Sequence, residues 1–419
     1  FVLDSSGSMS GPKIRQAKDA ARFIINHLND RDRFSIIDFD DGVTLFAPEL
    51  VPADRSHRDK ALKFVDDIQD SGGTNINDAL LQALKLIPSG DRPSYILFLT
   101  DGQPTVGQTA IVDILKNVGG ANTRRSRLFV FGLGNDVNTE LLDKLSSDNR
   151  GTSVYVGENE DLEVALSGYY EKISSPLLSG LSLAVQGVEV FDTYPRQLPD
   201  LFKGSQLVLI GRYKGEGPVN VALKGMVGRE ERRFVLEDVK LAKDEAYNFL
   251  PRLWATRRIG YLLEEIRLSG SNSELVDEIK KLGLKYGIVT PYTSFLVTEG
   301  ERETIAAAAP AAEQAIRTRT ATGAGGVQAA KISQKLKDEE QASQSLSTQI
   351  RYKEDKTFYL KDGFWVDSGY KDGSPVREVT FGSEAYFKLL TDSPGLARYL
   401  SVSETLILCY RGVNTKIIR

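Results

Sequence analysis

The chain has 419 residues, 41% of them hydrophobic and 26% charged, and a formal net charge of −4. This length suffices for two or three domains with separate cores, and the small net charge gives no sign of nucleic acid or an anionic membrane as a partner. No apolar run reaches the roughly 18 residues of a membrane-spanning helix. The single cysteine, Cys409, excludes an intrachain disulfide, and two histidines, His27 and His57, are too few for a zinc site without cysteine.

Residues 1–175 alternate strand and helix patterns. After a short apolar strand, apolar residues recur at spacings of three and four from Ile14 to Leu28, which predicts a helix. A tight turn at 40–42 joins two expected strands, 34–39 and 43–46. Further helices are expected around 61–68, 76–87, 111–118, 139–145 and 161–173, and further strands at 95–99, 128–132 and 153–156. This order predicts an α/β fold with a doubly wound, mostly parallel sheet of the Rossmann-like type between layers of helices.

Three loops of this unit carry side-chain oxygens. Asp4, Ser6 and Ser8 follow the first strand at alternate positions, so their side chains point the same way in an extended turn. Thr74 ends a Gly-rich turn before a helix, and Asp101 follows the central apolar strand. In open α/β sheets, loops at the carboxyl ends of neighbouring strands converge where ligands bind. We therefore expect these five side chains to meet.

Two carboxylates and three hydroxyls form a donor set for a hard divalent cation. Mg²⁺ is the usual choice when waters or a partner complete the shell, and Mn²⁺ and Ca²⁺ remain alternatives. Each hydroxyl taken alone has a plainer explanation, because Ser and Thr are favoured in turns and before helices. The five together predict a metal site at Asp4, Ser6, Ser8, Thr74 and Asp101.

This five-residue pattern resembles the von Willebrand factor A domain, whose metal-ion-dependent adhesion site reads D-x-S-x-S, then a Thr loop, then an Asp after the central strand. The resemblance implies that the two serines and the threonine contact the metal, and that the aspartates often act through water. It also implies an open coordination position, which takes an acidic group from a protein partner.

Signatures of common enzymes are absent from the sequence. It has no G-x-S-x-G elbow and no G-x-x-x-x-G-K phosphate loop. The Gly-rich loop at 132–136 lacks the third glycine of the dinucleotide fingerprint and is expected to be a strand-to-helix turn. Asp40 and Asp41 are expected to serve only the hairpin turn. We therefore predict that the protein is not an enzyme and has no catalytic residues.

The composition changes after residue 175. Residues 176–300 are expected to form a β-rich region followed by helices, with strands at 181–190, 206–213, 219–223 and 233–236, helices at 253–266 and 275–282, and an extended segment at 286–298. Together with the first unit, the stretches at 201–204, 253–255 and 286–298 resemble inter-α-trypsin inhibitor heavy chains and their bacterial relatives.

That resemblance implies a VIT domain (the vault protein inter-α-trypsin domain) before the von Willebrand domain. The chain opens in mid-strand without a Met, so we expect an upstream portion that carries this domain. In the heavy chains, covalent attachment to chondroitin sulfate uses an Asp-Pro site. The present sequence contains no Asp-Pro dipeptide, so we do not extend that chemistry to it.

Residues 301–350, rich first in Ala and then in Gln, Ser and Lys, are expected to be a linker with some helix propensity. Residues 351–419 are expected to be a small β-rich unit, with hairpins at 357–366 and 405–418 and a helix at 383–390. Within it, Trp365 and Tyr359 are expected to serve a core rather than a ligand platform, and Cys409 to be a buried strand residue.

The sequence thus predicts a metal-dependent protein-binding or adhesion module of a secreted or envelope protein, located outside the cytoplasm. A structural or assembly role, in which the metal only stabilises loops, is one alternative. An adaptor subunit for a separate ATPase is another, because the absence of a phosphate loop does not exclude it.

Overall fold

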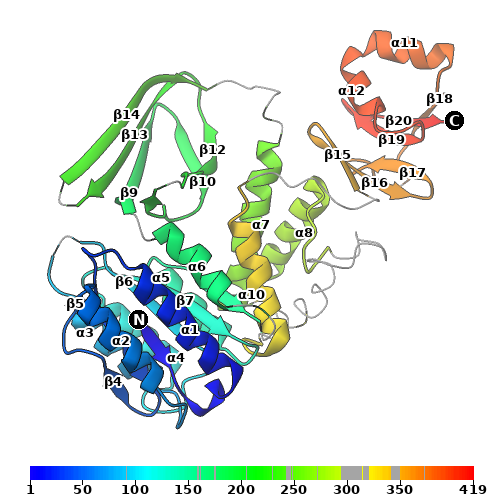
Figure 1. Ribbon diagram of the computed structural model, residues 1–419. Coiled ribbons are helices and arrows are strands. Elements are labelled where there is room, and N and C mark those ends of the chain that lie inside the picture. Colours follow the sequence, from blue (N-terminus) through cyan, green and yellow to red (C-terminus); the bar gives the residue numbers. More distant parts are fainter. Residues whose placement is uncertain are drawn as a thin grey trace.

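The structure is a computed structural model that describes residues 1–90, 92–157, 160, 162–173, 176–203, 205–228, 230–241, 247, 249–270, 272–293, 314, 320–340, 350–371 and 373–419. Figure 1 shows an N-terminal α/β unit, an antiparallel β arm, a group of long helices and a small C-terminal unit. Among the helices of the described residues, none combines the length and the hydropathy that a transmembrane segment requires.

The N-terminal unit is built on one six-stranded sheet in the order β4-β3-β1-β6-β7-β8. Its strands are β1 (Val2–Asp4), β3 (Ile37–Phe39), β4 (Val43–Leu45), β6 (Tyr95–Thr100), β7 (Arg127–Leu133) and β8 (Ser153–Val156). Only β4 runs antiparallel to its neighbour, as the second strand of the predicted hairpin. The predicted Rossmann-like α/β fold is confirmed, and the strand order changes direction between β1 and β6, where such sheets bind ligands.

Helices cover both faces of this sheet (Figure 1). They are α1 (Pro12–His27), α2 (Arg55–Asp67), α3 (Ile76–Leu86), α4 (Ile111–Ala121), α5 (Thr139–Asp148) and α6 (Leu162–Ile173), with a short 3-10 helix η1 (Gly7–Met9). Successive residues of β6 face opposite layers, as the pleat of a strand requires. Leu97 packs with Ile24 on the side of α1, α2 and α6, and Phe98 packs with Leu80 on the side of α3, α4 and α5.

One predicted strand of this unit is shorter than expected. Of the segment 34–39, only Ile37–Phe39 joins the main sheet, as β3. Phe34 belongs to β2 (Arg33–Phe34), which pairs with β5 (Val51–Pro52) in a separate two-stranded ladder. The apolar run is therefore divided between two ladders.

The β arm follows the α/β unit. Its strands are β9 (Pro176–Gln186), β10 (Glu189–Tyr194), β11 (Leu201–Phe202), β12 (Ile210–Lys214), β13 (Pro218–Val227) and β14 (Glu230–Lys240). They form an antiparallel sheet β11-β9-β13-β14 and a ladder β10-β12. The single strand predicted at 181–190 is wrong, because the chain turns at Gly187, whose φ is +105°, and continues in another ladder.

Among the described residues, the helical unit beside the α/β unit contains α7 (Leu250–Ser269), α8 (Ser273–Tyr286) and α10 (Gly323–Lys337). The last lies within the segment expected to be a linker, yet its Val327, Ile332 and Leu336 are buried. Small residues allow α7 and α10 to cross closely. A methyl group on Gly260 of α7 would lie 2.7 Å from the backbone nitrogen of Lys337 in α10. A linker therefore does not describe residues 323–337. Residues 294–298 of the predicted extended segment lie outside the described residues.

Buried ion pairs join these parts. Arg267 of α7 binds Asp143 of α5, and the side chains are only 5% and 6% exposed. Arg127, at the start of β7, binds Asp200 of the β arm, whose carboxylate also accepts a hydrogen bond from the Gly180 backbone at 2.8 Å. Because an unpaired charge at such sites would be costly, these pairs fix how the helical unit and the β arm sit on the α/β unit.

The C-terminal unit has a six-stranded sheet in the order β15-β16-β17-β19-β20-β18. Its elements are β15 (Ile350–Lys353), β16 (Lys356–Lys361), β17 (Phe364–Asp367), β18 (Arg377–Thr380), α11 (Glu384–Asp392), η4 (Pro394–Leu396), α12 (Ala397–Leu400), β19 (Leu406–Tyr410) and β20 (Val413–Ile418). Both predicted hairpins and the predicted helix are present. Trp365 is 6% exposed and lies 4.1 Å from the Arg351 guanidinium, and the Tyr359 hydroxyl donates to the Leu284 carbonyl, so neither forms a ligand platform. Cys409 lies in β19 as predicted, but it is half-buried.

Candidate metal centre

The five predicted side chains come from three loops at the carboxyl edge of the main sheet. Asp4 ends β1, and Asp101 directly follows β6, which pairs in parallel with β1. Thr74 lies in the loop that leads into α3, close to the start of this helix. The parallel alignment of β1 and β6 therefore places both carboxylates at the same edge, as the strand pattern predicted.

The first loop turns tightly after β1. The Ser6 backbone nitrogen donates to Asp4 Oδ1 at 2.9 Å, and the hydroxyls of Ser6 and Ser8 lie 3.2 Å apart. The short helix η1 begins directly after Ser6, and its Met9 is fully buried, which anchors the loop in the core. The alternation expected from the sequence thus brings the two serines together beside Asp4.

The other two loops meet the first at Ser8. The Ser8 hydroxyl donates to Asp101 Oδ1 at 2.8 Å. Gly102 lies between the remaining members, because a methyl group on it would be 3.4 Å from Thr74 Oγ1 and 3.7 Å from Ser8 Oγ. The structure therefore brings Asp4, Ser6, Ser8, Thr74 and Asp101 into one cluster, with no member left apart.

The two carboxylates of the cluster are fully buried, at 0% exposure each. Burial raises the pKa of Asp4 to about 6; hydrogen bonds from Ser6 and Thr100 oppose this rise, and the negative charge of Asp101 adds to it. Two carboxylates held in the interior favour a bound cation, and hydroxyl and carboxylate oxygens are ligands that Mg²⁺, Mn²⁺ and Ca²⁺ accept. The donor set thus fits a hard divalent ion.

Lys13 also contacts this cluster, which the sequence patterns did not indicate. It lies in the first turn of α1, and its Nζ is 2.6 Å from Asp101 Oδ2 and 3.4 Å from the Ser8 carbonyl oxygen. Its side chain is 22% exposed. Lys13 therefore supplies positive charge to the same carboxylate that a metal would need.

Thr100 is a second residue that the sequence analysis missed. Its hydroxyl donates to Asp4 Oδ2 and accepts a hydrogen bond from the Gly102 backbone nitrogen at 3.3 Å. Thr100 is the last residue of β6 and is fully buried. It orients the Asp4 carboxylate from the neighbouring strand. A polar residue at the end of an otherwise apolar strand was the available signal.

Asp40 and Asp41 do more than form the hairpin turn, contrary to the prediction. The Asp41 carboxylate accepts a hydrogen bond from the Gly73 backbone nitrogen at 2.6 Å. Asp40 accepts one from the Ser71 hydroxyl at 3.0 Å, and its carbonyl oxygen accepts another from the Asn75 backbone at 2.9 Å. The β3–β4 turn therefore holds the loop that carries Thr74.

The remaining candidates do not join the cluster. The loop at 132–136 is covered by the start of α10, where the Gly323 backbone nitrogen donates to the Asn135 carbonyl oxygen at 2.8 Å. The His27 ring stacks on Phe23, and His57 binds the N-cap residue Asp54 of α2. Within the described residues, no three His, Cys, Asp or Glu side chains come together as metal ligands, so the hydroxyl-rich cluster is the metal candidate.

Comparison with known proteins decides the identity of the α/β unit. The family model of the von Willebrand factor type A domain matches residues 1–167. Residues 1–167 are a von Willebrand factor type A domain. A solved structure described as von Willebrand factor type A from Catenulispora acidiphila has 16% sequence identity and a TM-score of 0.51, covers 77% of this chain and 88% of its own, and shares the fold.

Comparison with individual proteins shows that the similarity extends beyond this domain. The inter-alpha-trypsin inhibitor heavy chain H4 of Homo sapiens is 36% identical over 321 residues, which cover 71% of this chain and 34% of that protein. Heavy chain H3 of Bos taurus is 33% identical over 321 residues, which cover 72% of this chain and 36% of that protein. The alignments thus span about a third of the length of these relatives. The predicted resemblance to the heavy chains is confirmed.

Proposed function

We propose that the von Willebrand factor type A domain is a metal-dependent protein-binding module in which Asp4, Ser6, Ser8, Thr74 and Asp101 hold one Mg²⁺, Mn²⁺ or Ca²⁺ ion. The observation that carries this proposal is the convergence of two fully buried carboxylates and three hydroxyls at one edge of the sheet. When bound, the ion supplies a positive charge that an acidic side chain of another protein can bind.

Each residue of the cluster has a proposed role. The hydroxyls of Ser6, Ser8 and Thr74 are assigned as the direct ligands on the resemblance to the von Willebrand factor A site. Because hydroxyl oxygens are neutral, such ligands leave the charge of the ion available to a partner. Asp4 and Asp101 balance that charge from the interior, where Thr100 and Lys13 already hold them by a hydrogen bond and an ion pair. Ser8 is exposed, so the site opens towards solvent on its side, where a partner can approach.

The alternative role, in which the ion only stabilises the loops, has less support. Backbone hydrogen bonds already join the loops: Gly7 N to Gly72 O at 3.0 Å, Ser71 N to Ser5 O at 2.8 Å, and Thr105 N to Thr74 O at 3.0 Å. These hydrogen bonds link the loops through backbone atoms, without using the five side chains of the cluster. This connection favours a function of the ion in binding.

The wider setting is also a proposal. Similarity to inter-alpha-trypsin inhibitor heavy chains supports a non-enzymatic secreted or envelope protein that acts outside the cytoplasm. The same similarity supports a VIT domain in the full-length protein. An adaptor role beside a separate ATPase is the competing setting, and the identity of the captured partner distinguishes the two.

A metal-dependent capture experiment tests the function. The immobilised chain is exposed to envelope and cytoplasmic extracts of the source organism in Mg²⁺ and in EDTA, with Thr74→Ala as the site variant. Ser10→Ala is the matched control, because Ser10 is exposed and follows η1 outside the cluster. We expect an envelope protein that binds the wild type and Ser10→Ala only in Mg²⁺. Capture that is indifferent to EDTA and to Thr74→Ala would contradict the proposal, and a captured ATPase would favour the adaptor setting.

A further inference from the structure

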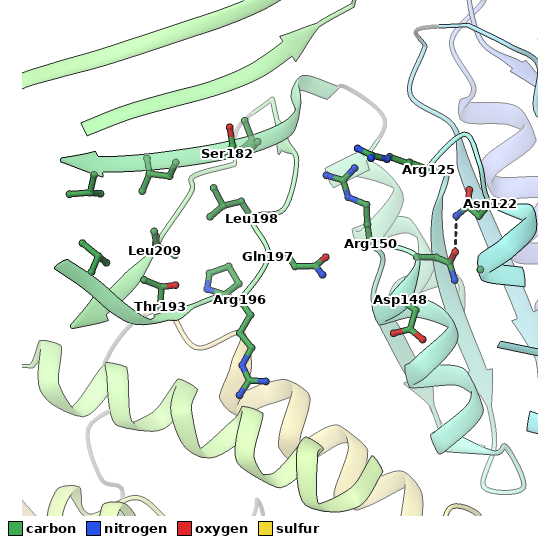
Figure 2. A pocket seen from close by; sticks show the side chains of 17 residues that line it. Asn122, Arg125, Asp148, Arg150, Ser182, Thr193, Arg196, Gln197, Leu198 and Leu209 are labelled. Atoms are coloured by element: carbon green, nitrogen blue, oxygen red, sulfur yellow. Dashed lines mark hydrogen bonds between the residues drawn. The ribbon is translucent and has the colours of Figure 1, made fainter. Parts of the chain in front are cut away.

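A cleft of about 870 Å³ separates the α/β unit from the β arm. Arg125 and Arg150 line one side, just before β7 and β8, and Leu181, Leu198 and Leu209 line the other (Figure 2). The volume lies within the range of about 300–1,000 Å³ that is typical of small-molecule sites. Since these strands run parallel to β6, the cleft is at the amino edge of the sheet, opposite the metal centre.

The α/β side of the cleft carries positive charge that no carboxylate of the described residues neutralises by an ion pair. Figure 2 shows the side chains of Arg125 and Arg150 extending side by side towards Leu198. Among the described residues, neither guanidinium has a carboxylate within ion-pair distance. The nearby carboxylate of Asp200 is bound by Arg127 instead. Asp148 also lines the cleft, but its side chain is turned away from both arginines in Figure 2.

The electrostatics of Arg150 agree with this picture. Burial lowers its pKa, the positive charges of Arg127 and Arg125 lower it further, and only Asp200 acts in the opposite sense. A third arginine of the cleft, Arg196, differs because it binds Glu265 at 3.3 Å. The unbalanced positive charge is therefore confined to the pair Arg125 and Arg150.

Both arginines occupy a backbone conformation that large side chains rarely adopt. The φ angles of Arg125 and Arg150 are +55° and +60°, in the left-handed region where Gly, Asn and Asp are the usual residues. At both positions the chain thus carries a cationic side chain where a small residue would suit the backbone conformation better. Such an outlier is a reason to look for a function.

The opposite side of the cleft carries a group of apolar side chains among the polar residues Ser182, Thr193 and Gln197. Leu181 is buried, Leu198 and Leu209 are half-buried, and Val190 is 39% exposed. Leucine side chains that face a pair of guanidiniums suit a molecule with both properties, because its apolar body leaves water while its head group forms charge-assisted hydrogen bonds. We infer that this cleft binds an anionic amphiphile, with its carboxylate or phosphate head on Arg125 and Arg150 and its apolar body on the β arm.

Isothermal titration calorimetry with decanoate below its micelle concentration tests this inference on the full chain. We expect one saturable site per chain, no binding of acetate, and no binding of decyltrimethylammonium, which has the same tail and the opposite charge. Decyl phosphate replaces decanoate in a parallel titration and shows which head group binds more tightly. Saturable binding of either anion supports the inference.

Variants then locate the site. Arg125→Asn with Arg150→Asn removes both charges and places a residue that tolerates positive φ at each corner, so the fold is kept, and decanoate affinity should fall at least tenfold. Leu198→Asp should abolish binding from the apolar side. Arg124→Gln is the control, because Arg124 donates to Ser89 and does not line the cleft. Absence of saturable binding of both decanoate and decyl phosphate, equal binding of decyltrimethylammonium, or unchanged affinity for the bound anion in the Asn double variant would overturn the inference.

Discussion

Lys13→Met should increase the affinity of the metal centre for Mg²⁺. The Lys13 ammonium lies 2.6 Å from Asp101 Oδ2. A divalent ion held by the cluster draws on the same carboxylate, so the ammonium and the metal compete for its charge. Met keeps the length and the helix propensity of the side chain and removes only the charge. The variant therefore isolates the contribution of the ion pair.

The magnitude follows from the burial of the two partners. Removing one member of a fully buried pair costs about 3–5 kcal/mol, and removing one from a surface pair costs about 0–1 kcal/mol. Because Lys13 is 22% exposed and Asp101 is 0% exposed, we expect an intermediate loss of about 1–3 kcal/mol in the metal-free protein. A metal would neutralise Asp101 in the bound protein, so the same energy should appear as roughly 5- to 150-fold tighter Mg²⁺ binding.

Isothermal titration calorimetry with Mg²⁺ measures this change, and melting curves in EDTA measure the loss of metal-free stability. Lys18→Met is the matched control on the same helix, because Lys18 donates to the carbonyl oxygens of Asp66 and Ile68 and contacts no member of the cluster. Unchanged or weaker Mg²⁺ binding by Lys13→Met would refute the reasoning. It would mean that the Lys13 ammonium and the metal bind Asp101 at the same time without competing.

Asp143→Asn leaves Arg267 buried without its carboxylate, so urea unfolding followed by tryptophan fluorescence should show a loss of about 3–5 kcal/mol. Asp143→Asn with Arg267→Met removes the buried cation and keeps an oxygen for the Ser153 and Tyr155 hydroxyls, so it should recover part of the loss; equal losses in both variants would count against the pairing. Thr100→Val removes the hydroxyl that donates to Asp4; we expect a loss of about 1–3 kcal/mol in thermal unfolding, together with weaker Mg²⁺ binding. Gly151→Ala would place a methyl group 1.9 Å from the backbone carbonyl oxygen of Leu128 in β7. Its melting temperature should fall by the equivalent of more than about 4 kcal/mol, and a near-normal value would show that the two segments can separate.

The cluster of the metal centre was predictable because two of its signals are local and the third is topological. Alternate spacing aligned Asp4, Ser6 and Ser8, and the end of an apolar strand marked Asp101. The parallel order of β1 and β6 then placed both at one edge. Lys13 was not predictable in this way, because a lysine in a first helical turn ordinarily reaches solvent. The direction in which the Lys13 side chain points depends on the position of the loop after β6, which carries Asp101.

The errors in the fold have a common physical origin, which is that composition does not reveal tertiary contacts. The Ala, Gln, Ser and Lys content of residues 301–350 favours a linker, but α10 lies within this segment, and its small residues are also what a close helix crossing at Gly260 requires. The apolar run from 181 to 190 predicts one strand, and the positive φ of Gly187 divides it. In both cases a glycine has a structural role, a close helix contact or a turn, that the composition of the segment does not reveal.

The central claim is most directly tested by crystals of the chain grown with Mn²⁺, whose anomalous scattering locates the ion without assumptions. We predict one strong anomalous peak in contact with the hydroxyl oxygens of Ser6, Ser8 and Thr74, and its loss in Asp101→Asn crystals grown under the same conditions. A peak at other residues, or no peak at the cluster at saturating Mn²⁺, would contradict the assignment of a metal-dependent binding site.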